Sequence, residues 1–170
     1  MKKFQPSNRH RARELAVQLL YSLSARPDQD IAECLNVFTS EDGFASEESP
    51  EVRDYLSFLI KGVWERRFEI DDLMRRVVTG WRPERMVAVD RAVLRIAIFE
   101  GFLEKTAPLA VAISEAVELV GAFGTEDSGK FVNGVLGKLA RSVEGQSKLS
   151  AENGHENDDA VAPSTTSTNR

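Results

Sequence analysis

The chain has 170 residues and a mass of 18.9 kDa, which is room for one domain or at most two small sub-bundles. Its composition is 42% hydrophobic and 29% charged, which is typical of a globular protein, and its single cysteine, Cys34, excludes an intramolecular disulfide and a four-thiolate zinc site. The net charge of −5 argues at first sight against a nucleic-acid-binding protein.

Apolar residues in the first half of the chain recur at steps of three and four, a spacing that predicts amphipathic helices. Ser7 or Asn8 can cap the first helix, and Pro50 suits the first turn of the third. Gly80 ends the fourth. Helices are therefore predicted over residues 9–24, 31–38, 50–67 and 68–78, with an acidic loop over residues 41–49.

The most apolar predicted helix begins at Pro83 and runs to about Lys105. Because this helix is apolar on most sides, we expect other helices to surround it. No alternation typical of strands persists along the chain, so we predict an all-α fold of about seven helices packed round this one. The expected core includes Val87, Val93, Leu94, Ile98 and Val117.

Two further helices complete the predicted fold, over residues 109–123 and from residues 125–128 to about residue 143. Gly134 and Gly137 lie inside the last of them, and each costs about 1 kcal/mol relative to alanine in a helix. Close approach of another helix would explain these glycines, and a kink is the alternative.

The net charge hides an uneven distribution along the chain. Residues 1–13 carry +5 with no acid, residues 14–144 carry −8, and residues 145–170 carry −2. A basic segment before an acidic body indicates nucleic-acid contact, and a solvated chain end is the alternative. The last segment has few apolar residues and is expected to be disordered. We therefore divide the chain into a flexible basic arm (1–8), a helical domain (9–144) and an acidic tail (145–170).

Motifs for catalysis, cofactor binding and metal binding are absent from the sequence. It has no phosphate-cradling glycine loop, no His-x-x-x-His pair and no Cys-x-x-Cys pair. The two histidines, His10 and His155, lie near the chain ends and do not complete a catalytic triad. The first residues have positive charge but no apolar stretch behind them, so no signal peptide is expected, and no apolar run of about 18 residues occurs that could span a membrane. We therefore expect a non-enzymatic, cytoplasmic protein with no cofactor, metal or membrane partner.

Three segments of the chain, taken in order, form a distinctive sequence pattern. They are RHRARELAVQLLYS over residues 9–22, DRAVLRIAIFE over residues 90–100, and VAISEAVELV over residues 111–120 followed by KFVNGVL over residues 130–136. Together they resemble the NusB family of bacterial transcription antitermination factors, over about residues 8–142. The chain departs from the family pattern at Ser114, where asparagine is usual, at Gly137, where aspartate is common, and at His10, which interrupts a run of arginines.

The resemblance implies an all-helical fold of two small three-helix sub-bundles. It also implies binding of the boxA element of ribosomal RNA leader transcripts together with NusE, a small-subunit ribosomal protein, in complexes with other Nus factors and RNA polymerase. The family includes monomers and dimers, so a homodimer stays open. The alternative function is a helical protein-interaction module, homodimeric or not, that binds no specific RNA.

Basic residues near the N-terminus and three residues of the last helix are the candidate RNA contacts. Arginine suits phosphate oxygens and stacks on bases, and pairing with surface acids is the alternative. The resemblance implies that Phe131 stacks on an RNA base beside Asp127, whereas the residues alone also allow Phe131 in the core and Asp127 as a helix cap. The candidate RNA-binding residues are Lys2, Lys3, Arg9, Arg11, Arg13, Asp127, Lys130 and Phe131.

Tyr21, Glu84 and Asp90 are the candidate contacts to a protein partner. The resemblance implies that Tyr21 and Asp90 lie on the surface that faces NusE, and tyrosine is a common interface anchor. Glu84 is also explained by the helix dipole, because it lies in the first turn of a predicted helix. The acidic body would attract a basic ribosomal protein.

Overall fold

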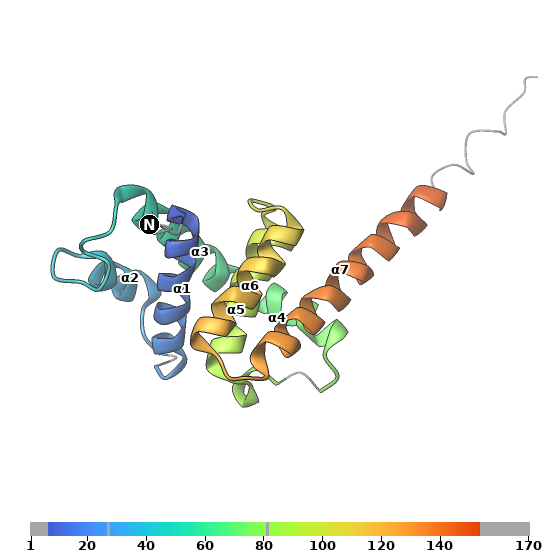
Figure 1. The fold of residues 1–170 in the computed structure, drawn as a ribbon, viewed down its shortest axis with the longest axis horizontal. Helices are drawn as coiled ribbons and strands as arrows, with labels where there is room; N and C mark the ends of the chain where they lie inside the picture. Colours follow the sequence, from blue (N-terminus) through green and yellow to red (C-terminus); the bar gives the residue numbers. More distant parts are fainter. Residues whose placement is uncertain (1–6, 27, 81, 154–170) are drawn as a thin grey trace, which may run out of the picture.

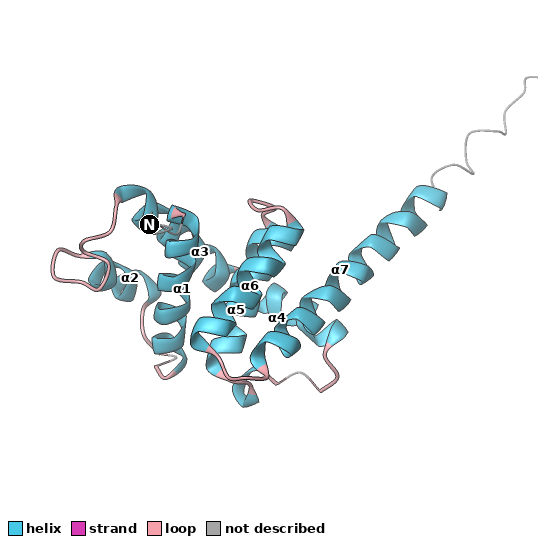
Figure 2. Ribbon diagram, in the orientation of Figure 1, coloured by secondary structure: helices cyan, strands magenta, loops and turns pink. Residues whose placement is uncertain are grey.

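The described part of the chain is almost entirely helical. The computed structural model describes residues 7–26, 28–80 and 82–153. In these ranges the helices are α1 (Asn8–Ser24), α2 (Ile31–Thr39), α3 (Pro50–Glu65), α4 (Arg67–Val77), α5 (Ala88–Ile98), α6 (Leu109–Phe123) and α7 (Ser128–Asn153), with a 3₁₀ turn η1 (Pro83–Arg85) and a π-helical turn η2 (Phe99–Leu103). No strand occurs among the described residues (Figure 2), which confirms the predicted all-α fold.

Side-chain caps explain where three of the helices begin. The Ser7 hydroxyl accepts a hydrogen bond from the backbone N–H of His10, and Asp30 caps α2 in the same way. Ser49 caps α3, with Pro50 in the first turn. These side chains replace hydrogen bonds that the first N–H groups of a helix lack, and each cap stabilises its helix by about 1 kcal/mol.

Helix α5 lies at the centre of the bundle. It contacts α1, α3, α4, α6 and α7. Figure 1 shows α1, α2 and α3 on one side of α5 and α6, and α7 on the other side. Val93, Leu94 and Ile98 of α5 have no exposed surface, and Val117 of α6 is half-buried. The expectation that this apolar helix is surrounded by others is confirmed.

The predicted helix that begins at Pro83 is interrupted. The turn η1 covers only three residues, and α5 begins at Ala88 because Val87 has non-helical backbone angles (φ −55°, ψ 124°). Val87 is 46% exposed, so its predicted place in the core is wrong. At its other end α5 widens into η2, where the Glu104 N–H bonds to the Phe99 carbonyl five residues earlier.

Close packing of one helix against another at glycine occurs at Gly62 and Gly101 rather than in the last helix. A Cβ atom at Gly62 would lie 2.0 Å from Cζ of Phe99, and a Cβ atom at Gly101 would lie 2.8 Å from a side chain of α6. At Gly134 a Cβ atom would meet nothing within 4 Å among the described neighbours, and at Gly137 it would meet only an arginine of its own helix. The close helix contact expected at these two glycines is therefore wrong.

Helix α7 continues past its predicted end near Val143 and reaches Asn153. Figure 1 shows its second half extending away from the other helices. The segment predicted as an acidic tail thus begins inside a helix, and residues 154–170 lie outside the described residues. None of the helices in the described ranges is both long and apolar enough to cross a membrane.

Candidate nucleic-acid and partner interfaces

The first turn of α1 carries two arginines that are held in place by contacts within the chain. Arg9 donates from Nη1 to the Thr106 carbonyl at 2.8 Å, and its guanidinium lies 4.8 Å from the centre of the Tyr55 ring. Arg11 donates to Glu48 at 2.7 Å and to Glu14 at 3.0 Å. Arg9 is exposed and Arg11 is half-buried, so both reach solvent. Lys2 and Lys3 lie outside the described residues.

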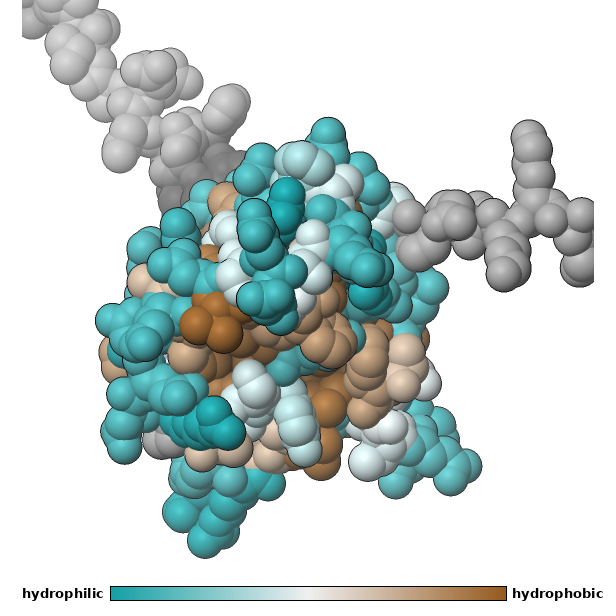
Figure 3. Space-filling view, turned by 90° about the vertical axis from the view of Figure 1, so that its left-hand side faces the viewer, coloured by the Kyte–Doolittle hydropathy of each residue, from teal (hydrophilic) through white to brown (hydrophobic). Residues whose placement is uncertain are grey.

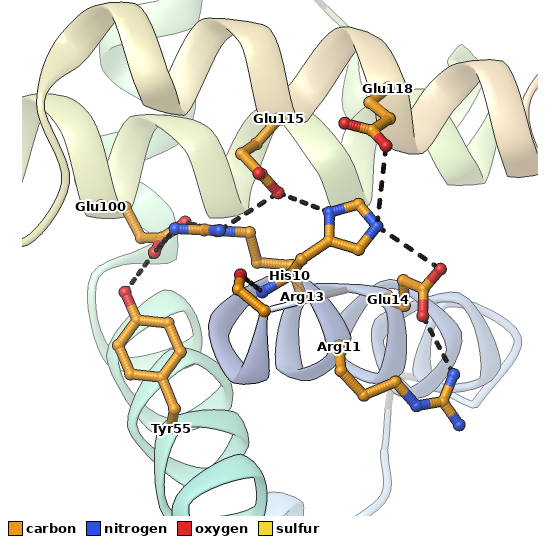
Figure 4. A network of polar contacts seen from close by, with 9 residues as sticks. His10, Arg11, Arg13, Glu14, Tyr55, Glu100, Glu115 and Glu118 are labelled. Atoms are coloured by element: carbon orange, nitrogen blue, oxygen red, sulfur yellow. Dashed lines mark hydrogen bonds and ion pairs between the residues drawn. The ribbon is translucent and has the colours of Figure 1, made fainter. Parts of the chain in front are cut away.

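Arg13 points into the protein rather than toward solvent. Arg13 is 3% exposed, and its guanidinium binds Glu100 with two hydrogen bonds, of 2.8 Å and 3.0 Å, while Nη1 lies 3.1 Å from Glu115 (Figure 4). The Tyr55 hydroxyl donates a further hydrogen bond to Glu100. This geometry uses the guanidinium inside the fold and offers no donor to RNA. We therefore correct the expectation that Arg13 contacts RNA. Its role is structural, because its contacts join α1 to η2 and α6.

The environment of this cluster shifts the pKa values of two of its members, Arg13 and Tyr55. Burial lowers the pKa of Arg13, but its hydrogen bonds to Glu100 and the charges of Glu100 and Glu115 outweigh burial, so the pKa of Arg13 is raised above its ordinary value. Burial and the hydrogen bond to Glu100 also raise the pKa of Tyr55. Arg13 therefore stays charged and Tyr55 keeps its proton throughout the physiological pH range.

A groove of about 330 Å³ lies between the C-terminal end of α4 and the first half of α7. Phe131 is half-buried there, where it packs against the core and also lines the groove. Lys130 and Lys138 provide positive charge, and Gly134 between them leaves the surface open. A half-buried aromatic ring in a groove that two lysines also line is suited to a nucleotide base and its phosphates. The remaining lining residues are Val77, Val78, Thr79 and Val135.

Two of the three residues predicted in this region line the groove, and the structure adds a third. Lys130 and Phe131 line it, while Asp127 is exposed just before α7 begins. Lys138 was missed by the sequence analysis. The spacing of the sequence indicates this position, because residues 130, 134 and 138 are four apart and therefore share one face of a helix.

The predicted partner contacts occupy different environments. Tyr21 is 55% exposed and lines a hollow of about 320 Å³ together with Val17, Gln18, Val89 and Phe123. Glu84 is exposed on η1. Asp90, beside Val89 in the chain, is only 5% exposed, and its Oδ1 has no hydrogen-bond partner among the described residues. The expected surface role of Asp90 therefore needs correction, because its side chain is buried.

A larger hollow, of about 710 Å³, lies at the end of the molecule that carries α2. Figure 3 faces this end and shows apolar patches among hydrophilic residues. The lining combines apolar side chains such as Val37 and Phe44 with the acids Asp28, Asp30, Glu33 and Asp42. This concentration of negative charge makes the hollow unsuited to RNA phosphates.

Comparisons with known proteins agree on one family. The family model of the NusB family matches residues 10–141. The transcription antitermination protein NusB of Symbiobacterium thermophilum is 40% identical over 141 residues, covering 81% of this chain and 92% of the relative.

Two solved structures are similar in fold to this chain. NusB of T. maritima has a TM-score of 0.70 and 34% identity, and covers 81% of this chain and 93% of its own. The second is a crystal structure of the antitermination factors NusB and NusE in complex with double-stranded RNA, with a TM-score of 0.69 and 24% identity. It covers 79% of this chain and 97% of the matched chain.

Proposed function

This chain belongs to the NusB family, and we propose that it is a non-enzymatic transcription antitermination factor that binds boxA RNA of ribosomal RNA leader transcripts together with NusE. One observation carries the proposal: two separate surfaces are available, an aromatic and basic groove at Phe131 and an apolar hollow at Tyr21. The first suits RNA and the second suits a protein partner. A similar fold was solved with NusE and double-stranded RNA, which supports the pair of partners.

We propose that the RNA contacts both the groove and the N-terminal end of α1. The groove supplies Phe131, Lys130 and Lys138, and the first turn of α1 supplies Arg9. Figure 1 shows the start of α1 and the start of α7 in different parts of the molecule. One RNA must therefore cross the surface between them to contact both. Lys2 and Lys3 are proposed to extend the contact beyond Arg9.

Salt dependence tests this electrostatic contact. If about four phosphates are neutralised, the logarithm of the affinity for single-stranded boxA RNA should fall against the logarithm of salt concentration with a slope near −3. Fluorescence anisotropy with labelled boxA RNA, with and without NusE, measures the slope, and a scrambled RNA of equal length is the control. We expect tighter binding to boxA in the presence of NusE. A flat salt dependence, or equal affinity for the scrambled RNA with NusE present, would contradict the proposal.

The hollow at Tyr21 is proposed as the contact surface for NusE. The exposed Tyr21 ring and Phe123, which is 37% exposed, both line this hollow, so a partner can bury two aromatic side chains there. The acidic body favours approach of a basic ribosomal protein. The resulting pair is proposed to act with other Nus factors on RNA polymerase in the cytoplasm.

Replacing Tyr21 by alanine is expected to weaken NusE binding about 30-fold, because a central tyrosine in an interface contributes about 2 kcal/mol. Isothermal titration calorimetry with purified NusE measures the change. Phe68→Ala is the matched control, since Phe68 is 69% exposed but lies on α4 and outside the hollow. Asp90 stays unchanged in this test because its replacement would disturb a buried position. Equal effects of the two substitutions would argue against this surface.

A further inference from the structure

The hollow of about 710 Å³ beside α2, the α2 hollow, shares no lining residue with the groove or with the hollow at Tyr21. Helix α1 contributes Leu19, Ser22 and Arg26 to the α2 hollow, whereas Val17 and Tyr21 line the other hollow. Spacings of three and four residues place each set on its own face of α1. The α2 hollow is therefore a surface separate from the two contact surfaces proposed above.

Two large apolar side chains of the α2 hollow face solvent. Val37 and Phe44 are each 65% exposed. The Phe44 ring lies 5.3 Å from the ring of Phe38, which also lines the hollow and packs against the core. Figure 3 shows apolar patches at this end of the molecule. Exposed apolar patches of this kind mark sites where another protein binds.

The backbone around Phe44 is held in place by contacts with α2. The Ala45 N–H donates to the Phe38 carbonyl at 2.9 Å, and Ala45 has no exposed surface. A Cβ atom at Gly43 would lie 2.3 Å from the Val37 carbonyl oxygen, so the loop packs directly against the end of α2. The backbone that carries the Phe44 ring is therefore fixed before a partner binds, which lowers the entropy cost of binding.

The α2 hollow also carries negative charge that is available to a partner. Its lining contains four acids and one base, Arg26, which gives a net charge of −3. The four acids are exposed, and none of them forms an ion pair with another described residue. Other exposed acids differ in this respect, since Glu69 and Asp72 pair with arginines of α4 or beside it. The four acids are Asp28, Asp30, Glu33 and Asp42.

We propose that the α2 hollow binds a basic segment of a protein partner. An aromatic or aliphatic side chain of the segment contacts Val37 and Phe44, and flanking lysines or arginines pair with the acids. RNA does not suit the hollow, because the acids repel phosphates. A second copy of this chain would bring an acidic body, with a charge of −8 over residues 14–144, and would be repelled in the same way. The proposal depends on neither the RNA contact nor the NusE contact.

Binding of designed peptides to the full chain tests the proposal without RNA or NusE. The labelled peptides KRLFRK, EDLFDE and KRSSRK are titrated with the protein, and fluorescence anisotropy measures Kd. We expect saturable binding of KRLFRK that weakens as NaCl is raised. The other two peptides lack either the cations or the apolar side chains, and should bind at least about tenfold more weakly. No saturable binding of KRLFRK, or equal binding of EDLFDE, would overturn the proposal.

Cys34 shows whether the peptide occupies this hollow. It is the only cysteine of the sequence, it is half-buried, and it lines the α2 hollow. A saturating concentration of KRLFRK is expected to slow the alkylation of Cys34 by iodoacetamide several-fold, because the bound peptide covers the thiol. Cys34→Ser should bind the peptide as the original protein does. An unchanged alkylation rate at saturation would place the peptide elsewhere and overturn the proposal.

Substitutions in the hollow separate its apolar and acidic contributions. Phe44→Ala is expected to weaken KRLFRK binding by about tenfold or more, and the double variant Glu33→Gln with Asp42→Asn by about fivefold. All three side chains are exposed, so the variants should keep the melting temperature of the original protein. Equal losses in matched controls outside the hollow would overturn the proposal. These controls are Phe68→Ala and the double variant Glu65→Gln with Glu126→Gln, which also replace exposed side chains.

Light scattering over a range of protein concentrations distinguishes the proposed partner from a second copy of the chain. We expect Phe44→Ala to have the same molar mass as the original protein at every concentration. A dimer that forms in the original protein and is lost in Phe44→Ala would assign the α2 hollow to a second copy and overturn the proposal.

Discussion

Replacing Arg13 by methionine is expected to lower the free energy of unfolding by about 3–5 kcal/mol, because it leaves a buried carboxylate without its cation. Glu100 is 1% exposed and receives two hydrogen bonds from Arg13, so among the described residues the Tyr55 hydroxyl would be the remaining hydrogen-bond donor to its carboxylate. Urea denaturation followed by circular dichroism measures the loss. It should appear as a lower midpoint with an unchanged slope.

Arg11 provides the matched control for Arg13. Its side chain is 36% exposed and pairs with Glu14 and Glu48 at the surface. Arg11→Met should therefore change stability by no more than about 1 kcal/mol. The double variant Arg13→Met with Glu100→Leu should recover much of the loss, because it removes both buried charges together. If Arg13→Met weakens RNA binding but leaves stability unchanged, Arg13 is an RNA contact after all.

Replacing Phe131 by alanine is expected to weaken boxA RNA binding by about 5- to 150-fold, which corresponds to the 1–3 kcal/mol of a base stacked on an aromatic ring. The ring lies in the groove beside Lys130, where a stacked base would place its phosphate near a cation. Anisotropy titrations with boxA RNA in the presence of NusE measure the affinity. The helix content should stay the same, because Phe131 is only half-buried and α7 continues far beyond it.

Phe44→Ala is the control for loss of an exposed ring. Phe44 is 65% exposed, and it lines the acidic hollow beside α2 instead of the groove. Its replacement should leave RNA affinity unchanged. If Phe131→Ala instead lowers the helix signal and the melting temperature while RNA affinity per folded molecule is unchanged, the ring belongs to the core alone.

Local signals in the sequence predict most helices of this protein but not the break before α5. Helices α1, α2 and α6 begin and end within about one residue of their predicted limits, because caps, prolines and glycines near their ends are local signals. The segment after Pro83 has continuous apolar spacing, so nothing in its pattern marks the non-helical backbone at Val87. Sequence spacing places a residue on a face but does not show that the chain leaves the helix.

The roles of the N-terminal arginines show the same limit. Positions 9, 11 and 13 look alike as parts of one basic run, yet the fold holds Arg9 at the surface and buries Arg13. The difference comes from Glu100, which is 87 residues from Arg13 and pairs with Arg13 but not with Arg9 or Arg11. A local pattern contains no information about which distant carboxylate will approach a given side chain.

The sequence by itself determined the all-helical class, most helix limits, the uneven charge and the family. Each of these depends on composition or on neighbours a few residues apart, which the sequence shows directly. Only the tertiary structure decided which charged groups are free to bind a partner, because burial and pairing depend on residues from different helices. In the tertiary structure Arg13 and Asp90 are buried, Lys138 lines the groove, and His10 lies between carboxylates of two helices.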